Sequence, residues 1–232
     1  MSTKTFLSIA SATLLFAAPV FAAGGGIAGK VTLSGKPPAE KPIKFLPECK
    51  AHGDATTTHY VVDASGGLAN VLVYVKSGLA QKAAAPTEAA VIDQSCCLYH
   101  PYVLGVQVGQ KLVIQNSDDT MHNVNATPSK NEGFNIPQAT KGTKNEKTFA
   151  KPEVFVKLSC NVHPWMFAYV GVVENPYFAV TGADGSFKIP GLPDGEYVLA
   201  AAHPKIQPEQ TAKVKVAGGE VKQDFTFKAP GN

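Results

Sequence analysis

The stretch that decides the fold of this chain is L-S-C-N-V-H-P-W-M, residues 158–166. It places a thiol, an imidazole and a thioether, at Cys160, His163 and Met166, between two segments whose alternating pattern predicts β-strands. These soft and borderline donors bind copper in preference to magnesium or calcium. The stretch therefore predicts a metal-binding loop that joins two strands.

A second imidazole is expected from an upstream turn. A trigonal copper site uses two His, one Cys and a weak axial Met, so the loop lacks one His. Residues 111–123, K-L-V-I-Q-N-S-D-D-T-M-H-N, predict a strand, a short polar loop and then His122. If that strand packs near the strand that ends at Cys160, His122 lies at the same end of the sandwich. We therefore expect one copper ion, bound by His122, Cys160, His163 and Met166.

The same residues resemble the cupredoxin family. The pattern C-x-x-H-P-x-M, with an aromatic residue before the Met, is similar to the ligand loop of amicyanin. The upstream N-x-D-x-x-x-H-N is similar to the first-His region of plastocyanin, amicyanin and pseudoazurin. The resemblance covers roughly residues 89–174 and implies a Greek-key β-sandwich with one type 1 copper site. The chain departs from the family in a long Gly-, Asn- and Lys-rich segment, residues 127–147.

The resemblance also implies roles for residues around the copper ligands. Asn116 is expected to brace the ligand loop through hydrogen bonds, and Asn123 is by position a further candidate for contact with a ligand. His163, flanked by Pro164 and Trp165, is expected near the surface in an apolar patch where a partner docks and the electron leaves. Exposure of this imidazole would let a proton displace it in the reduced state.

The leading functional prediction is a carrier of single electrons. Its expected partner is a redox protein such as a c-type cytochrome or a periplasmic dehydrogenase. Copper binding or delivery without redox cycling is the alternative, and an interaction module with a vestigial copper site is a third. An enzyme is not expected, because the further coppers of a multicopper oxidase need His-x-His pairs and the sequence has none.

Residues 1–22 have the pattern of a cleavable export signal. Lys4 supplies the positive start, residues 6–16 supply the apolar run, and Val20-Phe21-Ala22 supplies the cleavage site. No later segment reaches about 18 uninterrupted apolar residues, so no membrane span is expected in the mature chain. These features predict a soluble protein of the bacterial periplasm.

The composition favours an all-β fold without a nucleic-acid partner. Gly and Pro, 21 and 17 of 232 residues, are spread throughout, as expected for short strands joined by turns. The formal net charge is +3, and the chain contains no Arg. Lys lacks the bidentate fork that recognises phosphates and base edges, which argues against nucleic-acid binding.

Residues 175–232 predict a second, small β-sandwich. Their pattern A-V-T-G-A-D-G-S-F-K-I-P-G-L-P-D-G-E-Y-V-L resembles transthyretin-like, carboxypeptidase regulatory-like modules, and Asp-Gly turns separate its strands. Strands within residues 23–88 look like the start of the same kind of sandwich. Two arrangements are open: the copper domain is inserted within this sandwich, or the N-terminal segment packs separately on the copper domain.

The remaining cysteines predict a disulfide. Adjacent residues on a strand face opposite sides, so at most one of Cys96 and Cys97 should meet Cys49. The pairing Cys49–Cys97 is favoured, with Cys49–Cys96 as the alternative, and either would tie the N-terminal segment to the copper domain. A second metal site at Cys96, Cys97 and His100 is also open.

Overall fold

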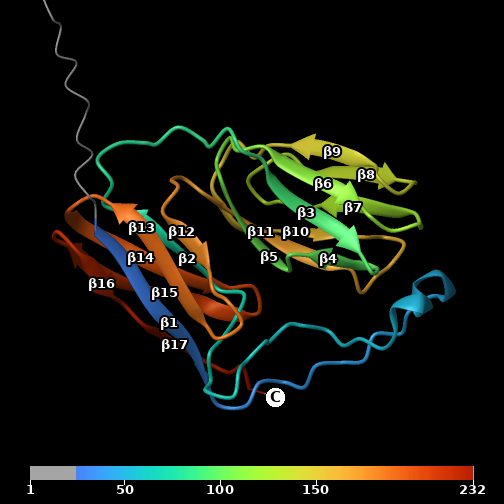
Figure 1. The fold of residues 1–232 in the computed structure, drawn as a ribbon, viewed down its shortest axis with the longest axis horizontal. Coiled ribbons are helices and arrows are strands. Elements are labelled where there is room, and N and C mark those ends of the chain that lie inside the picture. Colours follow the sequence, from blue (N-terminus) through green and yellow to red (C-terminus); the bar gives the residue numbers. More distant parts are fainter. Residues whose placement is uncertain (1–24, 232) are drawn as a thin grey trace, which may run out of the picture.

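The computed structural model describes residues 25–231, except for the side chains of residues 50–52. The expected export signal, residues 1–22, lies outside the described residues. Within the described part, the regular elements are β-strands and one short 3-10 helix, η1 (Pro47–His52). The expected all-β fold is therefore confirmed, and Figure 1 shows two sandwiches side by side. No helix in residues 25–231 has the length and apolar character needed to cross a membrane.

The central sandwich is formed by the strands between residues 90 and 173. One sheet has the order β5-β11-β10-β7-β8 and the other has the order β4-β3-β6-β9. The strands are β3 (Ala90–Ser95), β4 (Leu98–His100), β5 (Val103–Gln107), β6 (Leu112–Asn116), β7 (His122–Ala126), β8 (Phe134–Gln138), β9 (Lys144–Lys147), β10 (Glu153–Ser159) and β11 (Phe167–Val173). Alternate residues of these strands, such as Leu112 and Ile114, point inward and form one buried apolar cluster. The Gly-, Asn- and Lys-rich segment 127–147 contributes the edge strands β8 and β9.

The split sandwich is built from both ends of the described chain. β1 (Gly25–Ser34) pairs with β13, β16 and β17, and β2 (Leu72–Ser77) lies between β12 and β14. The other strands are β12 (Phe178–Val180), β13 (Ser186–Leu192), β14 (Gly195–His203), β15 (Ile206–Val216), β16 (Glu220–Lys222) and β17 (Phe225–Lys228). The N-terminal strands therefore complete the C-terminal sandwich, and the central sandwich is inserted between β2 and β12. The resemblance of this module to transthyretin-like domains stays a prediction.

The two sandwiches meet where glycines leave room for large side chains. Phe178 lies against Gly105 of β5, and Leu72 lies against Gly171 of β11. A Cβ atom would come within 2.5 Å of the Phe178 ring at Gly105 and within 2.3 Å of Leu72 at Gly171. Interiors are close-packed, so a side chain at either glycine would push the sandwiches apart.

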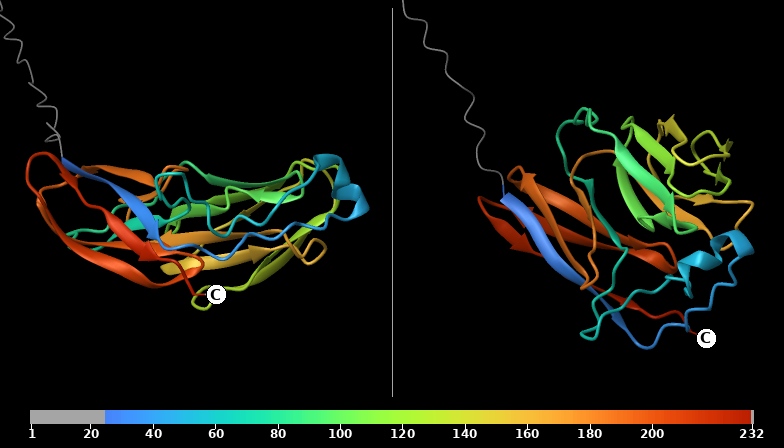
Figure 2. Two further views of the ribbon diagram at one scale, coloured as in Figure 1. Left: turned by 90° about the horizontal axis from the view of Figure 1, so that it is seen from below. Right: turned by 45° about the vertical axis from the view of Figure 1, so that its right-hand side comes forward.

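Residues 36–58, here called the lid segment, leave the split sandwich after β1 and reach the far end of the central sandwich (Figures 1 and 2). Its two arms bond to each other: the Ile43 N–H donates to Ala55 O at 2.8 Å, and the Thr57 N–H donates to Lys41 O at 2.9 Å. The helix η1 and the residues just before it, from Phe45 on, form its tip. After the lid segment, Val62 makes an isolated antiparallel bridge to Leu68.

Candidate metal centre

Residues 160–166, here called the ligand loop, connect β10 to β11. The last register partners of this antiparallel pair are Ser159 and Phe167. Two backbone hydrogen bonds tighten the loop, since the Cys160 N–H donates to Met166 O at 3.1 Å and the Met166 N–H donates to His163 O at 2.9 Å. The exposed fractions of Cys160, His163 and Met166 are 3%, 0% and 0%. The loop therefore holds its three potential ligands inside the protein.

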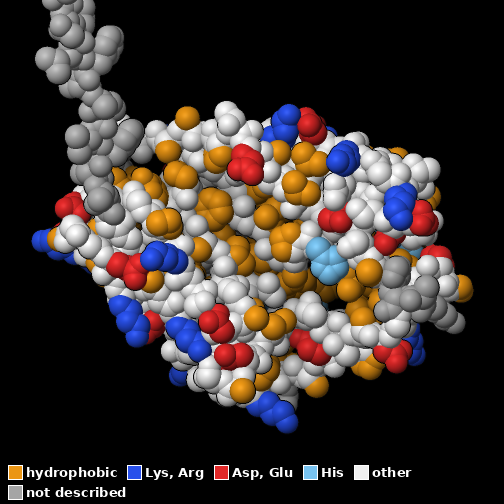
Figure 3. All heavy atoms as spheres, in the orientation of Figure 1, with side chains coloured by type: hydrophobic (Ala, Val, Ile, Leu, Met, Phe, Trp, Pro, Cys, Tyr) orange, Lys and Arg blue, Asp and Glu red, His pale blue; other side chains and the backbone are white. Residues whose placement is uncertain are grey.

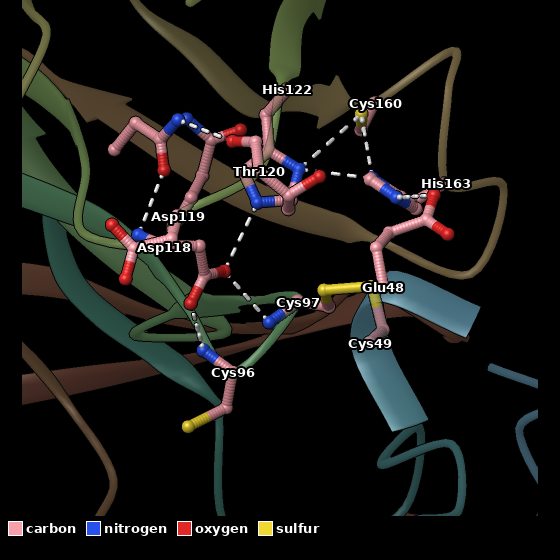
Figure 4. A network of polar contacts seen from close by, with 12 residues as sticks. Glu48, Cys49, Cys96, Cys97, Asp118, Asp119, Thr120, His122, Cys160 and His163 are labelled. Carbon is pink, nitrogen blue, oxygen red and sulfur yellow. Dashed lines mark hydrogen bonds and ion pairs between the residues drawn. A yellow bond between two sulfur atoms is a disulfide. The ribbon is translucent and has the colours of Figure 1, made fainter. Parts of the chain in front are cut away.

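His122 reaches these residues because it begins β7, which pairs with β10 through Asn125 and Ser159. Its Nδ1 atom lies 2.9 Å from His163 Nδ1 and 4.0 Å from Cys160 Sγ. Cys160 Sγ lies 3.7 Å from His163 Nδ1. Figure 4 shows the three side chains pointing toward one another from two different elements.

These separations fit a single metal ion. Two donors that bind one ion at about 2.0–2.3 Å lie at most about 4.6 Å apart, and all three distances are shorter than this limit. Met166 closes the same loop and belongs to the same buried cluster as Cys160. The structure therefore brings the thiol of Cys160 and the imidazoles of His122 and His163 together at one buried end of the sandwich, and Met166 is buried in the same loop.

Carboxylates fix the orientation of both imidazoles. Asp118 Oδ2 lies 3.0 Å from His122 Nε2, and Glu48 Oε1 lies 3.3 Å from His163 Nε2. A neutral imidazole that donates from Nε2 carries its lone pair on Nδ1. Both lone pairs would then point into the 2.9 Å gap between the Nδ1 atoms, where they repel each other unless a cation lies near them. The donor set therefore fits a bound metal ion.

Burial favours the neutral, metal-binding form of His122. Burial is the main reason that the pKa of His122 is lowered, and the nearby His163 lowers it further, whereas Asp118 acts in the opposite direction. The pKa of Glu48 is also lowered, first by its own backbone N–H and then by contact with His163. Glu48 therefore stays a charged acceptor for the His163 N–H.

Of the two asparagines, only Asn116 has a role different from the expected one. Asn116 does not brace the ligand loop, because its Nδ2 donates to Thr120 O at 2.9 Å and its Oδ1 accepts from the Asp118 N–H at 2.9 Å. It shapes the turn that precedes His122. Asn123 contacts the ligand loop instead: its Oδ1 accepts from the Asn161 N–H at 2.7 Å and lies 3.5 Å from Cys160 Sγ.

The expectation that His163 lies near the surface is wrong. Its side chain is fully buried, and Glu48, at the tip of the lid segment, contacts its Nε2 edge. Of the expected docking patch, Pro164 is exposed, whereas Trp165 is half-buried. The Trp165 ring meets Phe45 of the lid segment edge-on at 5.4 Å, and its Nε1–H donates to Cys97 O at 3.0 Å. An apolar patch with an exposed imidazole at its centre is therefore absent from this end of the described structure.

A disulfide joins Cys49 at the lid tip to Cys97 of the central sandwich. This is the pairing that the sequence favoured, but the strand argument behind it does not hold. Cys96 and Cys97 form the two-residue turn between β3 and β4, with φ values of 54° and 52°. Both turn N–H groups donate to the Asp118 carboxylate at 2.8 Å, which supports this left-handed conformation. Cys97 is thus unavailable for the alternative metal site with Cys96 and His100.

Sequence reasoning missed Glu48 and Asp118. Asp118 stands inside the N-x-D-x-x-x-H-N pattern, four residues before His122, so its position was a usable signal. Glu48 lies 115 residues from His163 in the chain, and the only hint of its position was its neighbour Cys49.

No family model and no curated protein matches this chain. Among solved structures it is similar to a purple cupredoxin from Nitrosopumilus maritimus, with 26% identity and a TM-score of 0.32, over 36% of this chain and 98% of that chain. It is similar to a copper-containing nitrite reductase from Thermus scotoductus SA-01, with 23% identity and a TM-score of 0.35, over 42% of this chain and 25% of that one. An oxidized mutant of amicyanin matches with 23% identity and a TM-score of 0.34, over 43% of this chain and 97% of that chain.

Proposed function

We propose that this protein binds one copper ion through His122, Cys160, His163 and Met166 and carries single electrons between other redox proteins. The observation that carries the proposal is the convergence of Nδ1 of His122, Nδ1 of His163 and Sγ of Cys160, separated by 2.9–4.0 Å. Copper, when bound, would supply a one-electron couple, and a site with two His, one Cys and a Met suits that couple.

The protein's own residues hold this site in one arrangement. Asp118 and Glu48 orient the imidazoles, Asn123 lies beside the Cys160 sulfur, and backbone hydrogen bonds close the ligand loop. Contacts from groups around the ligands fix ligand geometry and tune a metal's redox potential. A site braced in this way needs little rearrangement when an electron arrives or leaves, which suits a carrier rather than an enzyme.

The proposal includes where the protein works and what it meets. Residues 1–22 have an export-signal pattern, so we place the mature protein in the bacterial periplasm. A c-type cytochrome or a periplasmic dehydrogenase is the proposed partner, docking at the end of the central sandwich that carries Pro164.

Absorption spectroscopy and voltammetry test this function. Addition of Cu(II) is expected to give an intense Cys-to-copper charge-transfer band at one copper per chain, with a reversible one-electron wave. Cys160→Ser should remove the band, whereas the matched Cys96→Ser, at an exposed thiol, should keep it. A band that survives Cys160→Ser, or a colourless Cu(II) protein, would contradict the proposal.

Copper binding without redox cycling is the second candidate, and the buried His163 favours it. A covered imidazole gives a partner protein no direct contact with a ligand. If the copper protein shows the band but no reversible wave, storage or delivery replaces electron transfer as the function.

A further inference from the structure

The lid segment is anchored at its base by its own hydrogen bonds. Glu40 accepts from the Tyr60 N–H at 2.6 Å and also from the Thr57 hydroxyl, and the two arms bond to each other at Ile43 and Ala55. These bonds join parts of the lid to each other or to its exit, not to the ligand loop. They would therefore persist if the tip moved away from the metal centre.

The arms do not pack tightly on the central sandwich. A groove lies beside the lid, lined by Ile43 and Thr57 on one side and by Tyr102, Trp165 and Phe167 on the other. Figure 3 shows hydrophobic side chains around a hollow on this face of the molecule. The tip therefore provides the main attachment of the lid segment to the metal-binding end.

The tip of the lid segment makes three contacts of unequal strength with the metal-binding end of the central sandwich. The Glu48 side chain is 39% exposed, so solvent weakens its interaction with His163. The edge-on contact between Phe45 and Trp165 adds a modest attraction. The disulfide between Cys49 and Cys97 is covalent, and its sulfurs lie within 4.8 Å of a His163 ring nitrogen. The disulfide is thus the bond that keeps the tip over His163.

The tip covers one edge of the buried His163 imidazole. Its neighbours Val162 and Pro164 are exposed, so the ligand loop itself lies at the surface. Glu48 contacts the outward Nε2 edge of the imidazole, and Figure 4 shows the lid helix and the disulfide beside His163. Removal of the tip would leave this edge open to solvent.

We propose that the Cys49–Cys97 disulfide is a redox-sensitive latch, and that its cleavage by a dithiol opens the lid and exposes His163. In this step the S–S bond breaks, Cys49 and Cys97 each gain one electron and one proton, and the dithiol that supplies them becomes a disulfide. The opened form gives a chelator, a metal donor or a redox partner access to the imidazole that the closed form covers. The functional consequence rests on the proposed function, because it requires His163 to be a ligand.

A metal-free experiment tests the latch by itself. Trp165 is the only tryptophan and contacts both sides of the latch, so its fluorescence reports lid opening. In a Cys96→Ser/Cys160→Ser protein, only Cys49 and Cys97 remain. Dithiothreitol should raise the acrylamide quenching constant of Trp165 at least about two-fold, because the opened lid no longer shields the indole ring. Reoxidation should reverse this rise, because the rest of the fold stays intact.

The same protein gives the result that would overturn the latch. If mass spectrometry shows full reduction and the quenching constant stays unchanged, the lid is held without the disulfide. If far-UV circular dichroism is lost on reduction, the disulfide holds the fold rather than the lid, and the proposal also fails.

A copper experiment tests the consequence for the metal centre. Copper removal by a chelator is compared between Cys96→Ser, which keeps latch and ligands, and the same protein with Cys49→Ser and Cys97→Ser added. The protein without the disulfide should lose copper about ten-fold faster. In the latched protein the chelator must wait for the lid to open, whereas without the disulfide the lid opens more often. Equal rates would show that the lid does not control access, whereas failure of the Cys96→Ser protein to bind copper would refute the proposed function and leave the fluorescence result standing.

Discussion

The two sandwiches share one architecture but bury different chemistry. Each has two sheets around an aliphatic core, with Leu158 fully buried in the central sandwich and Leu199 in the split sandwich. Among the described residues, the buried polar side chains of the central sandwich include the imidazoles, carboxylate and amides of His122, His163, Asp118, Asn116 and Asn123. Those of the split sandwich and its link are Asn175, Thr181 and His203.

This difference marks the candidate metal centre. A buried polar group destabilises a fold unless it is hydrogen-bonded, so a cluster of such groups needs a reason. In the central sandwich these polar groups surround Cys160 at one end. Asp118 contacts the His122 imidazole, and Asn123 accepts a hydrogen bond from the backbone of the ligand loop. The split sandwich has no such cluster of buried polar groups at one end in the described structure.

The largest expected effect is shared by both cores. Leu158→Ala and Leu199→Ala should each lower the free energy of unfolding by about 2–5 kcal/mol, because each leaves a cavity at a fully buried position. Only Leu158→Ala, two residues before Cys160, should also change the copper charge-transfer band. Denaturant unfolding and copper titration of the two variants check this, and a changed band in Leu199→Ala would break the separation between the sandwiches.

Acid should weaken the split sandwich through His203. Burial lowers the pKa of His203 to about 4, and the positive charge of Lys205 adds to this effect. The unfolded chain binds this proton more readily, so stability is full above about pH 6.5 and declines as pH falls, by about 3 kcal/mol near pH 4. His203→Gln should flatten this decline in denaturant unfolding of the metal-free protein at several pH values. An unchanged slope would remove His203 as its cause.

Loss of Asp118 should affect stability and metal together. Asp118→Ala leaves the Cys96 and Cys97 N–H groups and the His122 Nε2 without this acceptor. The free energy of unfolding should therefore fall by about 1.5–3 kcal/mol. Copper affinity should fall as well, because His122 loses its orienting contact. The matched Asp184→Ala, at an exposed turn of the split sandwich where Asp184 accepts from Ser186, should change stability much less and copper binding not at all. Equal copper affinities in the two variants would contradict the role of Asp118.

The smallest effect comes from a matched pair of asparagines. Asn123 and Asn175 are each 7% exposed and each hold a turn by their side-chain amide. Replacement of either by Ala should lower stability by about 1 kcal/mol. Only Asn123→Ala should shift the reduction potential, since only Asn123 lies beside the Cys160 sulfur. Voltammetry of the two copper-loaded variants measures this shift. An equal reduction potential in both variants would show that Asn123 acts on the fold alone.

Local patterns were sufficient for much of the fold and of the candidate site. Alternation of apolar residues predicted the strands on either side of Cys160, and the ligand loop lies between β10 and β11. The sequence predicted that His122 lies near Cys160 only if the strand before His122 packs beside the strand that ends at Cys160. In the structure His122 reaches Cys160 because β7, which His122 begins, pairs with β10; the preceding strand β6 is not involved. Pairing between strands is a long-range choice that a local pattern leaves open.

Three features that the sequence did not explain depend on contacts between distant residues. His163 is covered by a residue 115 positions away, so nothing near it in sequence announces its burial. The brace expected from Asn116 is supplied by Asn123, because the chain crosses between sheets after Asn116. Cys97 reaches Cys49 from a left-handed turn, and Asp118, from another strand connection, supports that turn.

By itself, the sequence determined the all-β class and the candidate donor residues of the loop between β10 and β11, because strand alternation and donor chemistry are properties of neighbouring residues. Only the tertiary structure decided that β1 completes a sandwich with β13, that the central sandwich is inserted in it, and that a disulfide-bound lid covers His163. These features join segments far apart in the chain. Their free energy comes from packing and hydrogen bonds that exist only after the chain has folded.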